Sequence, residues 1–182
     1  DRHPEESLAA HEPVTVEPLD PVLVAVLHVG GMPGDLAAAR GMGQSTQVDG
    51  HHVHPTAAKL ALASKPRGKL IIVTDAMSPV GTTDTEFAFF DGKVTRTGNK
   101  LTAESGQLAG SVLDMAGAVQ YAVTELGVEQ GEALRMASLY PAEFIGQAST
   151  MGRIAPGYRA DLVLLDDAGV TQQCWIGGER QS

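Results

Sequence analysis

Residues 69–77 read Lys69-Leu70-Ile71-Ile72-Val73-Thr74-Asp75-Ala76-Met77, and this stretch decides the predicted fold. Its four consecutive apolar residues are too few for a helix and have no helical period, so they predict a strand buried on both faces. The run ends at Asp75, and residues 78–81 (Ser-Pro-Val-Gly) cannot continue a strand. Because α/β barrels and open α/β sheets place their chemistry at the carboxyl ends of buried strands, Asp75 is a candidate catalytic residue. The alternative is that it caps a following turn or helix.

The composition bounds the class of protein. The chain has 182 residues, of which 43% are hydrophobic and 19% charged, enough for one domain or parts of two. Its net charge of -9 argues against a nucleic-acid or membrane-surface partner, although a small anionic ligand needs only a few local cations or amides. The single cysteine, Cys174, cannot form an internal disulfide, so we expect a reducing, cytoplasmic location. No apolar run approaches the roughly 18 residues of a membrane span.

A cluster of histidines lies upstream, in Asp49-Gly50-His51-His52-Val53-His54-Pro55. If residues 48–54 are extended, His52 and His54 lie on the same face, because side chains alternate along a strand. Two imidazoles on one face could bind a metal ion, or one could polarise a carbonyl group while the other orients it. A surface cluster without a role is the alternative that spacing alone leaves open.

The segment between the histidines and Asp75 is predicted to be helical. Residues 57–62 are rich in Ala and Leu and follow Pro55, which favours the first turn of a helix. Residues 66–68 (Pro-Arg-Gly) end this helix and lead into the strand at residues 71–73. An extended segment, a helix and a buried strand in this order predict a βαβ unit of a parallel sheet.

The middle of the chain predicts a hairpin followed by helices. Residues 87–95 favour a hairpin that turns at Asp91-Gly92. Residues 106–111 are predicted to be a small, flexible loop that enters a helix over about residues 112–126, since Ser111 and Asp114 have capping-box spacing. A glycine-rich loop before a helix can hold a phosphate or sugar on its amides, although such loops are also common connectors.

The two ends of the chain have a different pattern. Residues 132–139 predict a further helix, and residues 162–166 and 170–176 predict strands with a tight turn at Gly177-Gly178. No helix follows each of these strands, so the tail is expected to form a separate layer. Near the amino terminus, residues 22–27 are also strand-like.

Several of these stretches together resemble a known family. The pattern Gly152-x-Ile154-x-x-Gly157-x-x-Ala160-Asp161-Leu162-Val163 resembles the C-terminal β-sandwich signature of the amidohydrolase superfamily. Within that superfamily, residues 49–55, 73–76 (Val-Thr-Asp-Ala), 108–111 (Leu-Ala-Gly-Ser) and 134–142 are similar, in order and spacing, to the N-acetylglucosamine-6-phosphate deacetylases. The resemblance covers about residues 48–182.

The resemblance implies a fold and a reaction. It implies an α/β chain with part of a (β/α)8 TIM-like barrel over residues 48–150 and a β-sandwich segment over residues 151–182; residues 1–47 are unassigned. The implied reaction is hydrolysis of the N-acetyl group of N-acetylglucosamine 6-phosphate, which gives glucosamine 6-phosphate and acetate. The implied partner is therefore a small phosphorylated amino sugar, and the resemblance also allows a homodimer.

The resemblance also assigns roles to residues. The family's barrel-end aspartate falls on Asp75, which would take a proton from the attacking water and pass it to the departing amine. The family's substrate histidine falls on His52, which would polarise the acetyl carbonyl. Leu108, Ala109 and Gly110 match the segment that lies along the sugar. A divalent metal, zinc or iron, would act as Lewis acid in the intact family enzyme.

One part of the family pattern is missing. The glutamate and two histidines that hold the family's metal, and the arginine that meets the phosphate, are not recognisable in residues 1–47. We therefore expect this chain by itself to lack the metal site and to be inactive, and one hypothesis is that residues 1–47 are read in another frame. Two other classes stay open: another metal-dependent amidohydrolase, of dihydroorotase or deaminase type, and a non-catalytic remnant that acts only by packing.

Overall fold

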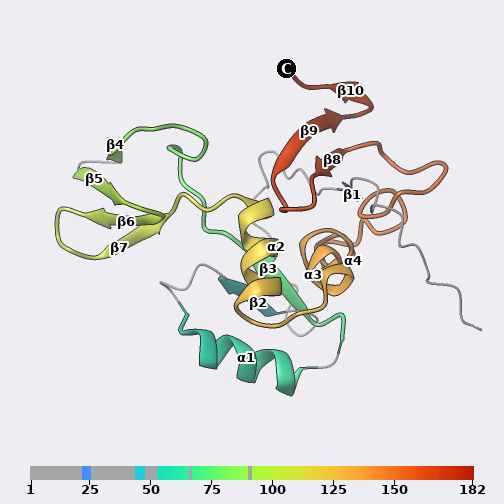
Figure 1. Ribbon diagram of the computed structural model, residues 1–182, viewed down its shortest axis with the longest axis horizontal. Coiled ribbons are helices and arrows are strands. Elements are labelled where there is room, and N and C mark those ends of the chain that lie inside the picture. The colour runs from blue at the N-terminus through green and yellow to red at the C-terminus, as the bar shows by residue number, and fades with distance from the viewer. Residues whose placement is uncertain (1–21, 26–43, 48–52, 66, 90–91) are drawn as a thin grey trace, which may run out of the picture.

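The computed structural model describes residues 22–25, 44–47, 53–65, 67–89 and 92–182, and Figure 1 shows their arrangement. These residues form helices and three separate sheets. No helix in the described part of the chain is long and apolar enough to cross a membrane.

The predicted βαβ unit is confirmed. It consists of β2 (Gln44–Gln47), α1 (Pro55–Ser64) and β3 (Leu70–Val73). The two strands are parallel and in register from Gln44 opposite Leu70 to Gln47 opposite Val73. The first strand therefore precedes the extended segment expected at residues 48–54, of which residues 48–52 lie outside the described part.

Local sequence explains where α1 begins. Pro55 occupies its first turn, and the backbone N–H of Thr56 donates a hydrogen bond to Nδ1 of His54 at 3.2 Å. Ala58 is the buried residue of this helix, whereas Leu60 on its outer side is 70% exposed. Leu62 is half-buried and packs against the same core, so α1 contacts the core through Ala58 and Leu62.

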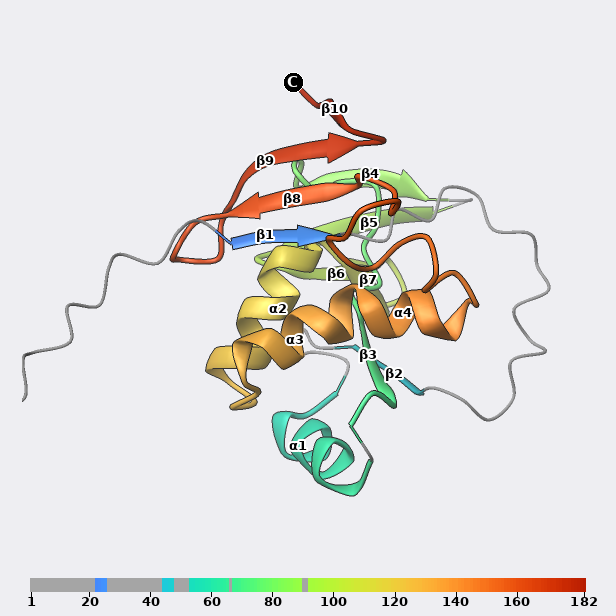
Figure 2. The ribbon, with the colours of Figure 1, turned by 90° about the vertical axis from the view of Figure 1, so that its right-hand side faces the viewer.

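Three further helices pack near β3 and build the main core (Figure 2). They are α2 (Met115–Thr124), α3 (Gln130–Ala137) and α4 (Leu139–Phe144). The alternate residues Leu70 and Ile72 of β3 are buried at 6% and 2% exposure. Leu126 joins this core from the residues after α2, and the three helices contribute Ala118, Val119, Ala122, Ala133, Met136, Ala137, Leu139 and Tyr140.

The start of α2 corrects the predicted capping box. The helix begins at Met115, and its cap is Asp114, whose side chain accepts a hydrogen bond from the N–H of Gly117 at 2.7 Å. Ser111 is not a cap, because it belongs to a strand, β7 (Leu108–Ser111). The loop predicted at residues 106–111 is therefore wrong for residues 108–111.

The strand β7 closes a small antiparallel sheet with β4 (Glu86–Phe89), β5 (Gly92–Thr97) and β6 (Lys100–Ala103). The predicted hairpin of β4 and β5 is confirmed, but Gly92, which was expected in the turn, belongs to β5 and lies opposite Phe89. Residues 90–91 lie outside the described part. This sheet has its own core of Val94, Leu101 and Val112, and in Figure 1 it extends away from the helices.

The carboxyl-terminal tail forms the third sheet. The two predicted strands are present as β8 (Leu162–Leu165) and β9 (Thr171–Ile176). They pair antiparallel with each other, β10 (Glu179–Arg180) pairs antiparallel with β9, and β1 (Val22–Ala25) adds to the edge of β8. Side chains of β8, β9, α2 and α3 line a common apolar cavity, so the sheet lies against these helices. The described part of the tail is a single sheet, and the expected β-sandwich stays a prediction.

Candidate active site

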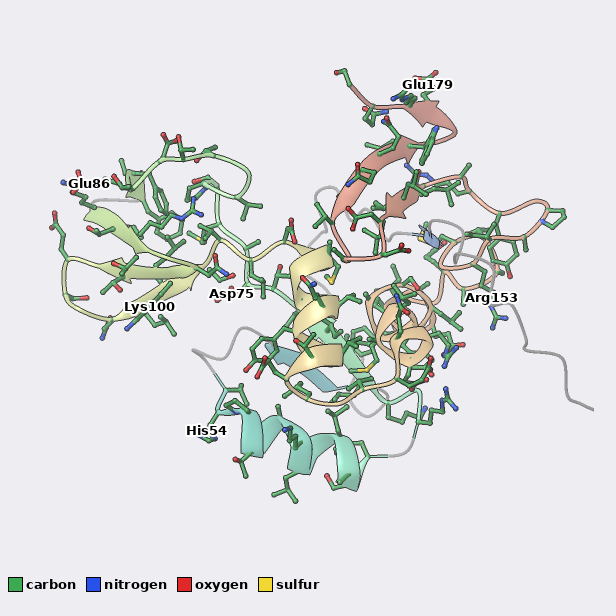
Figure 3. All side chains as sticks on the ribbon, viewed as in Figure 1. His54, Asp75, Glu86, Lys100, Arg153 and Glu179 are labelled. Atoms are coloured by element: carbon green, nitrogen blue, oxygen red, sulfur yellow. The ribbon has the colours of Figure 1, made fainter. Side chains whose placement is uncertain are left out.

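Asp75 lies just beyond the carboxyl end of β3, where its sequence placed it. It is exposed, and Figure 3 shows it where the chain passes between the β4–β7 sheet and α2. Its φ of 53° is in the left-handed region, which residues other than glycine adopt uncommonly, Asp and Asn more often than most. Since β2 and β3 are parallel, their carboxyl ends are at one edge of the sheet. This is the edge at which α/β folds place their chemistry.

The strand β7 runs directly beside Asp75. Gly110 is buried with φ at +88°, and a Cβ built there would lie 2.9 Å from the carbonyl oxygen of Asp75 and 2.6 Å from Cγ of Met77. Only glycine fits so close an approach with a positive φ. The structure therefore brings Asp75 together with the strand that carries the predicted substrate-binding residues Leu108, Ala109 and Gly110.

The two segments are also joined by backbone hydrogen bonds. The N–H of Ser111 donates to the carbonyl oxygen of Asp75 at 2.9 Å, and the N–H of Met77 donates to the carbonyl oxygen of Ser111 at 2.9 Å. Ala76 and Ser111 form an isolated parallel bridge. Residues far apart in sequence are thus held together by backbone hydrogen bonds at the end of β3.

The histidine cluster is described only in part. His52, the predicted substrate histidine, lies outside the described residues, as do His28 and His51. His54 is exposed, and its Nδ1 is already used as the acceptor at the start of α1. The predicted pair of imidazoles, His52 and His54 on one face, therefore stays a prediction.

The described residues do not fit a metal site. Nowhere in the described ranges do three His, Cys, Asp or Glu side chains come close enough together to hold a metal ion. The single described histidine, His54, serves as a helix cap.

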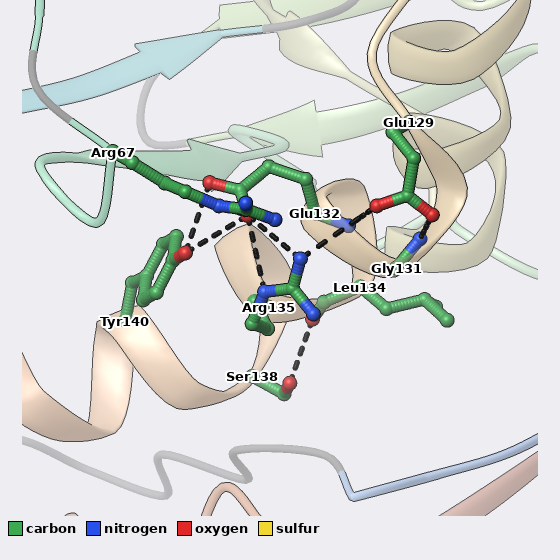
Figure 4. A network of polar contacts seen from close by, with 8 residues as sticks. All are labelled: Arg67, Glu129, Gly131, Glu132, Leu134, Arg135, Ser138 and Tyr140. Atoms are coloured by element: carbon green, nitrogen blue, oxygen red, sulfur yellow. Dashed lines mark hydrogen bonds and ion pairs between the residues drawn. The ribbon is translucent and has the colours of Figure 1, made fainter.

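A network of charged side chains lies near the opposite end of β3 (Figure 4). Glu132 of α3 accepts hydrogen bonds from Nε of Arg67 at 2.6 Å, from Arg135 at 2.9 and 3.0 Å, and from the Tyr140 hydroxyl at 2.9 Å. The Glu132 side chain is only 17% exposed, whereas that of Arg67 is 67% exposed. The network ties the turn before β3 to α3 and α4.

The network shifts the pKa values of its members. Burial by itself would raise the pKa of the Glu132 carboxyl, but hydrogen bonds from Arg67, Arg135 and Tyr140 outweigh it and hold this pKa below its usual range. The backbone amides of Gly131 and Glu132 lower the pKa of the Glu129 carboxyl in the same way. The Glu132 carboxylate in turn raises the guanidinium pKa values of Arg67 and Arg135.

A cavity of about 400 Å³ adjoins this network, lined by Leu62, Lys65, Arg67, Gly68, Leu70, Glu129, Glu132 and Met136. It lies near the amino end of β3, away from Asp75. Features at that end of a barrel strand usually serve stability, so we assign the chemistry to the end that carries Asp75. Sequence analysis missed this network, although Glu132 and Arg135 have the spacing of a helical ion pair.

A comparison with known protein families identifies the family of this chain. The model of a family described as "Amidohydrolase family" matches residues 29–180. The chain belongs to the amidohydrolase family. Members of this family are generally metal-dependent, and the family match begins before the motifs recognised at residues 48–182.

Similar proteins within this family are deacetylases of amino-sugar phosphates. The chain is 50% identical over 149 residues to an N-acetylgalactosamine-6-phosphate deacetylase of Shewanella sp. (strain ANA-3), covering 82% of this chain and 38% of that protein. It is 31% identical over 161 residues to the N-acetylglucosamine-6-phosphate deacetylase of Homo sapiens, covering 88% and 38% of the two chains. The crystal structure of the N-acetylglucosamine-6-phosphate deacetylase of Pasteurella multocida superposes with a TM-score of 0.73 at 31% identity, over 80% and 38%.

The matched region covers only part of each relative. The chain spans 38% of the length of each of these three amidohydrolases. The likeness to a solved barrel enzyme supports a partial TIM-barrel-like α/β fold, to which the βαβ unit and α2 to α4 belong.

Proposed function

We propose that this chain supplies the general base and part of the sugar-binding surface of a deacetylase. The proposed substrate is an N-acetylhexosamine 6-phosphate, and the products are the hexosamine 6-phosphate and acetate. The observation that carries the proposal is the contact between Asp75 at the end of β3 and the strand β7 with Leu108, Ala109 and Gly110. The names of the relatives support the class of substrate.

The residues would share the reaction as follows. Water attacks the acetyl carbonyl carbon, while the Asp75 carboxylate accepts a proton from that water. The carbon–nitrogen bond then breaks, and Asp75 returns the proton to the departing amine nitrogen. His52 would polarise the acetyl oxygen, and the β7 backbone would lie along the sugar ring. A divalent metal is proposed only for an intact enzyme, because the described residues do not fit one.

The relatives favour the galacto epimer of the substrate. Identity to the N-acetylgalactosamine-6-phosphate deacetylase of Shewanella is 50%, against 31% to the human N-acetylglucosamine-6-phosphate deacetylase. We therefore propose that N-acetylgalactosamine 6-phosphate is used at least as well as its gluco epimer. Both sugars are to be tested side by side, because they differ only in the configuration at one hydroxyl-bearing carbon.

A hybrid enzyme tests the proposal directly. Residues 53–182 would replace the matching part of the Shewanella relative, and acetate release would be measured with both sugar phosphates. We expect the hybrid to be active and Asp75→Asn to lower kcat by roughly 10²–10⁴-fold, as expected for loss of a general base. Asp167→Asn, which alters an exposed carboxylate in the β8–β9 turn, is the matched control and should leave kcat unchanged.

The 182-residue chain supplies the second arm of the test. Purified alone with added zinc or iron, it is expected to release no acetate above the buffer rate. Rapid deacetylation by the isolated chain would show that it holds a complete site. An inactive hybrid, or a fully active Asp75→Asn hybrid, would refute the proposed function and favour a remnant that acts by packing.

A further inference from the structure

Ser111 is a completely buried hydroxyl beside the candidate base. Its exposed fraction is 0%, and its Oγ donates a hydrogen bond to the carbonyl oxygen of Thr74 at 2.6 Å. The same Oγ accepts a hydrogen bond from the N–H of Leu113 at 3.2 Å. Because donor and acceptor functions are both used, the hydroxyl is held in one orientation. It connects the end of β7 to the residue immediately before Asp75.

The backbone of Ser111 completes this connection on both sides. Its N–H bonds to the carbonyl oxygen of Asp75, and its carbonyl oxygen accepts from the N–H of Met77. Ser111 thus forms hydrogen bonds with three residues that follow β3, namely Thr74, Asp75 and Met77. Gly110 packs closely against the same segment. We call these contacts of Gly110 and Ser111 with residues 74–77 the β7 clasp.

The clasp explains how Asp75 keeps an uncommon conformation. A residue with a side chain stays at a φ such as 53° only where its surroundings fix it, and such residues gather at functional sites. Relaxation of φ to a negative value would turn the Cα–Cβ bond of Asp75 and carry its carboxylate away. The conformation therefore sets the direction in which this carboxylate points from the end of β3.

The geometry points to Ser111 as a positioning residue that holds the Asp75 carboxylate in its working orientation. This inference rests on the proposed function for its catalytic meaning. Ser111 itself is buried and acts through Asp75 and not on the substrate. Small misplacements of a catalytic group are costly, so the loss of one buried hydroxyl should lower the rate without changing the affinity for the sugar.

The first test uses the full 182-residue chain. Amide hydrogen exchange at residues 77 and 111 and the HN–Hα coupling of Asp75, which reports its φ, would be measured in Ser111→Ala and Ser111→Cys. The control is Ser138→Ala, because Ser138 is also buried and its hydroxyl donates to the Leu134 carbonyl oxygen at 2.6 Å. We expect exchange at residues 77 and 111 to rise about tenfold in Ser111→Ala, by less in Ser111→Cys, and not in the control.

The outcomes of this first test are distinct. A changed coupling at Asp75 together with locally faster exchange supports the clasp. Unchanged exchange and coupling in Ser111→Ala overturn it. Equally faster exchange throughout the chain in Ser111→Ala and Ser138→Ala also overturns it, because the hydroxyl would then serve only general stability.

The second test uses the active hybrid described above. Ser111→Ala should lower kcat roughly ten- to hundredfold with KM unchanged, whereas Ser138→Ala should leave both constants unchanged. A raised KM with an unchanged kcat would overturn the positioning role. A hybrid that is inactive before any substitution refutes the proposed function instead, and the exchange and coupling measurements still support or overturn the clasp.

Discussion

Glu132→Gln is the substitution that should most clearly expose how β3 is held against the helices. Glu132 accepts hydrogen bonds from two guanidinium groups and from the Tyr140 hydroxyl, and its side chain is 17% exposed. Glutamine keeps the shape but has no charge and turns a donor group toward donors. The substitution therefore removes the negative charge and one of the two acceptor oxygens that connect the turn before β3 to α3 and α4.

The magnitude follows from the partners that remain. A hydrogen bond to a charged group contributes about 1.5–3 kcal/mol, and a bond retained by the glutamine oxygen offsets part of the loss. The contribution of Arg67 is discounted because its side chain is 67% exposed and screened by solvent. We expect a loss of about 2–3 kcal/mol in the free energy of unfolding. At about 2–4 °C per kcal/mol for a domain of this size, Tm should fall by about 4–12 °C.

The effect should also depend on pH in a fixed direction. The pKa of the Glu132 carboxyl is lowered in the folded state, so its stabilisation is complete above the unfolded value of about 4.3. It is lost as the pH falls through the lower folded pKa. The difference in stability between wild type and Glu132→Gln should therefore be full at pH 7 and should close in more acidic solution.

Urea unfolding followed by circular dichroism at several pH values measures both effects. The control is Glu143→Gln, because Glu143 belongs to an exposed ion pair. Its Oε1 lies 4.0 Å from Nη2 of Arg153, and the two side chains are 47% and 54% exposed. That exposed pair should change the free energy of unfolding by less than about 0.5 kcal/mol. Equal losses in the two variants, or a difference for Glu132→Gln that persists at acidic pH, would refute the reasoning.

Three further substitutions, the first with a matched control, test other contacts. Gly110→Ala should lower the free energy of unfolding by about 2–4 kcal/mol, because of its close contacts and its φ of +88°. The control Gly106→Ala, with φ of +82° and open space around it, should lower it by about 1–2 kcal/mol, both measured by urea unfolding. Leu101→Ala should cost about 2–5 kcal/mol, with hydrogen exchange accelerated in β4 to β7 and not in α2 to α4. Asp161→Ala removes the acceptor 2.7 Å from the Gly177 amide nitrogen, so exchange at Gly177 should rise and stability should fall by about 1–3 kcal/mol. Unaltered exchange at Gly177 would show that this bond contributes nothing.

Elements whose signal is local were predictable. The apolar run of β3, the hairpin of β4 and β5, and the strands of the tail are set by alternation, run length and turn residues within a few positions. The boundaries were less accurate: β2 lies before the expected extended segment, and α2 starts at Met115. Residues 44–47 are all polar and carry no apolar strand pattern, and at the start of α2 both Ser111 and Asp114 are residue types that can cap a helix.

Ser111 shows why local pattern is sometimes misleading. Its spacing from Asp114 matches a capping box, yet Asp114 caps the helix by itself. The Ser111 hydroxyl instead bonds to Thr74, which is 37 positions away in the sequence. A cap is a contact within a few residues, whereas this bond exists only after β7 has packed against residues 74–77, which follow β3.

The sequence alone determined that a buried strand ends on Asp75, and that a motif of Leu, Ala, Gly and Ser follows further along the chain. Only the tertiary structure decided that this motif is a strand and that Gly110 and Ser111 contact the segment around Asp75. It also decided that Glu132 of α3 forms a hydrogen bond with Arg67. The physical reason is the separation in sequence between the residues that interact. Strand formation depends on side chains that are neighbours in sequence, whereas the direction of a carboxylate and the pairing of a charge depend on segments that meet only in the folded chain.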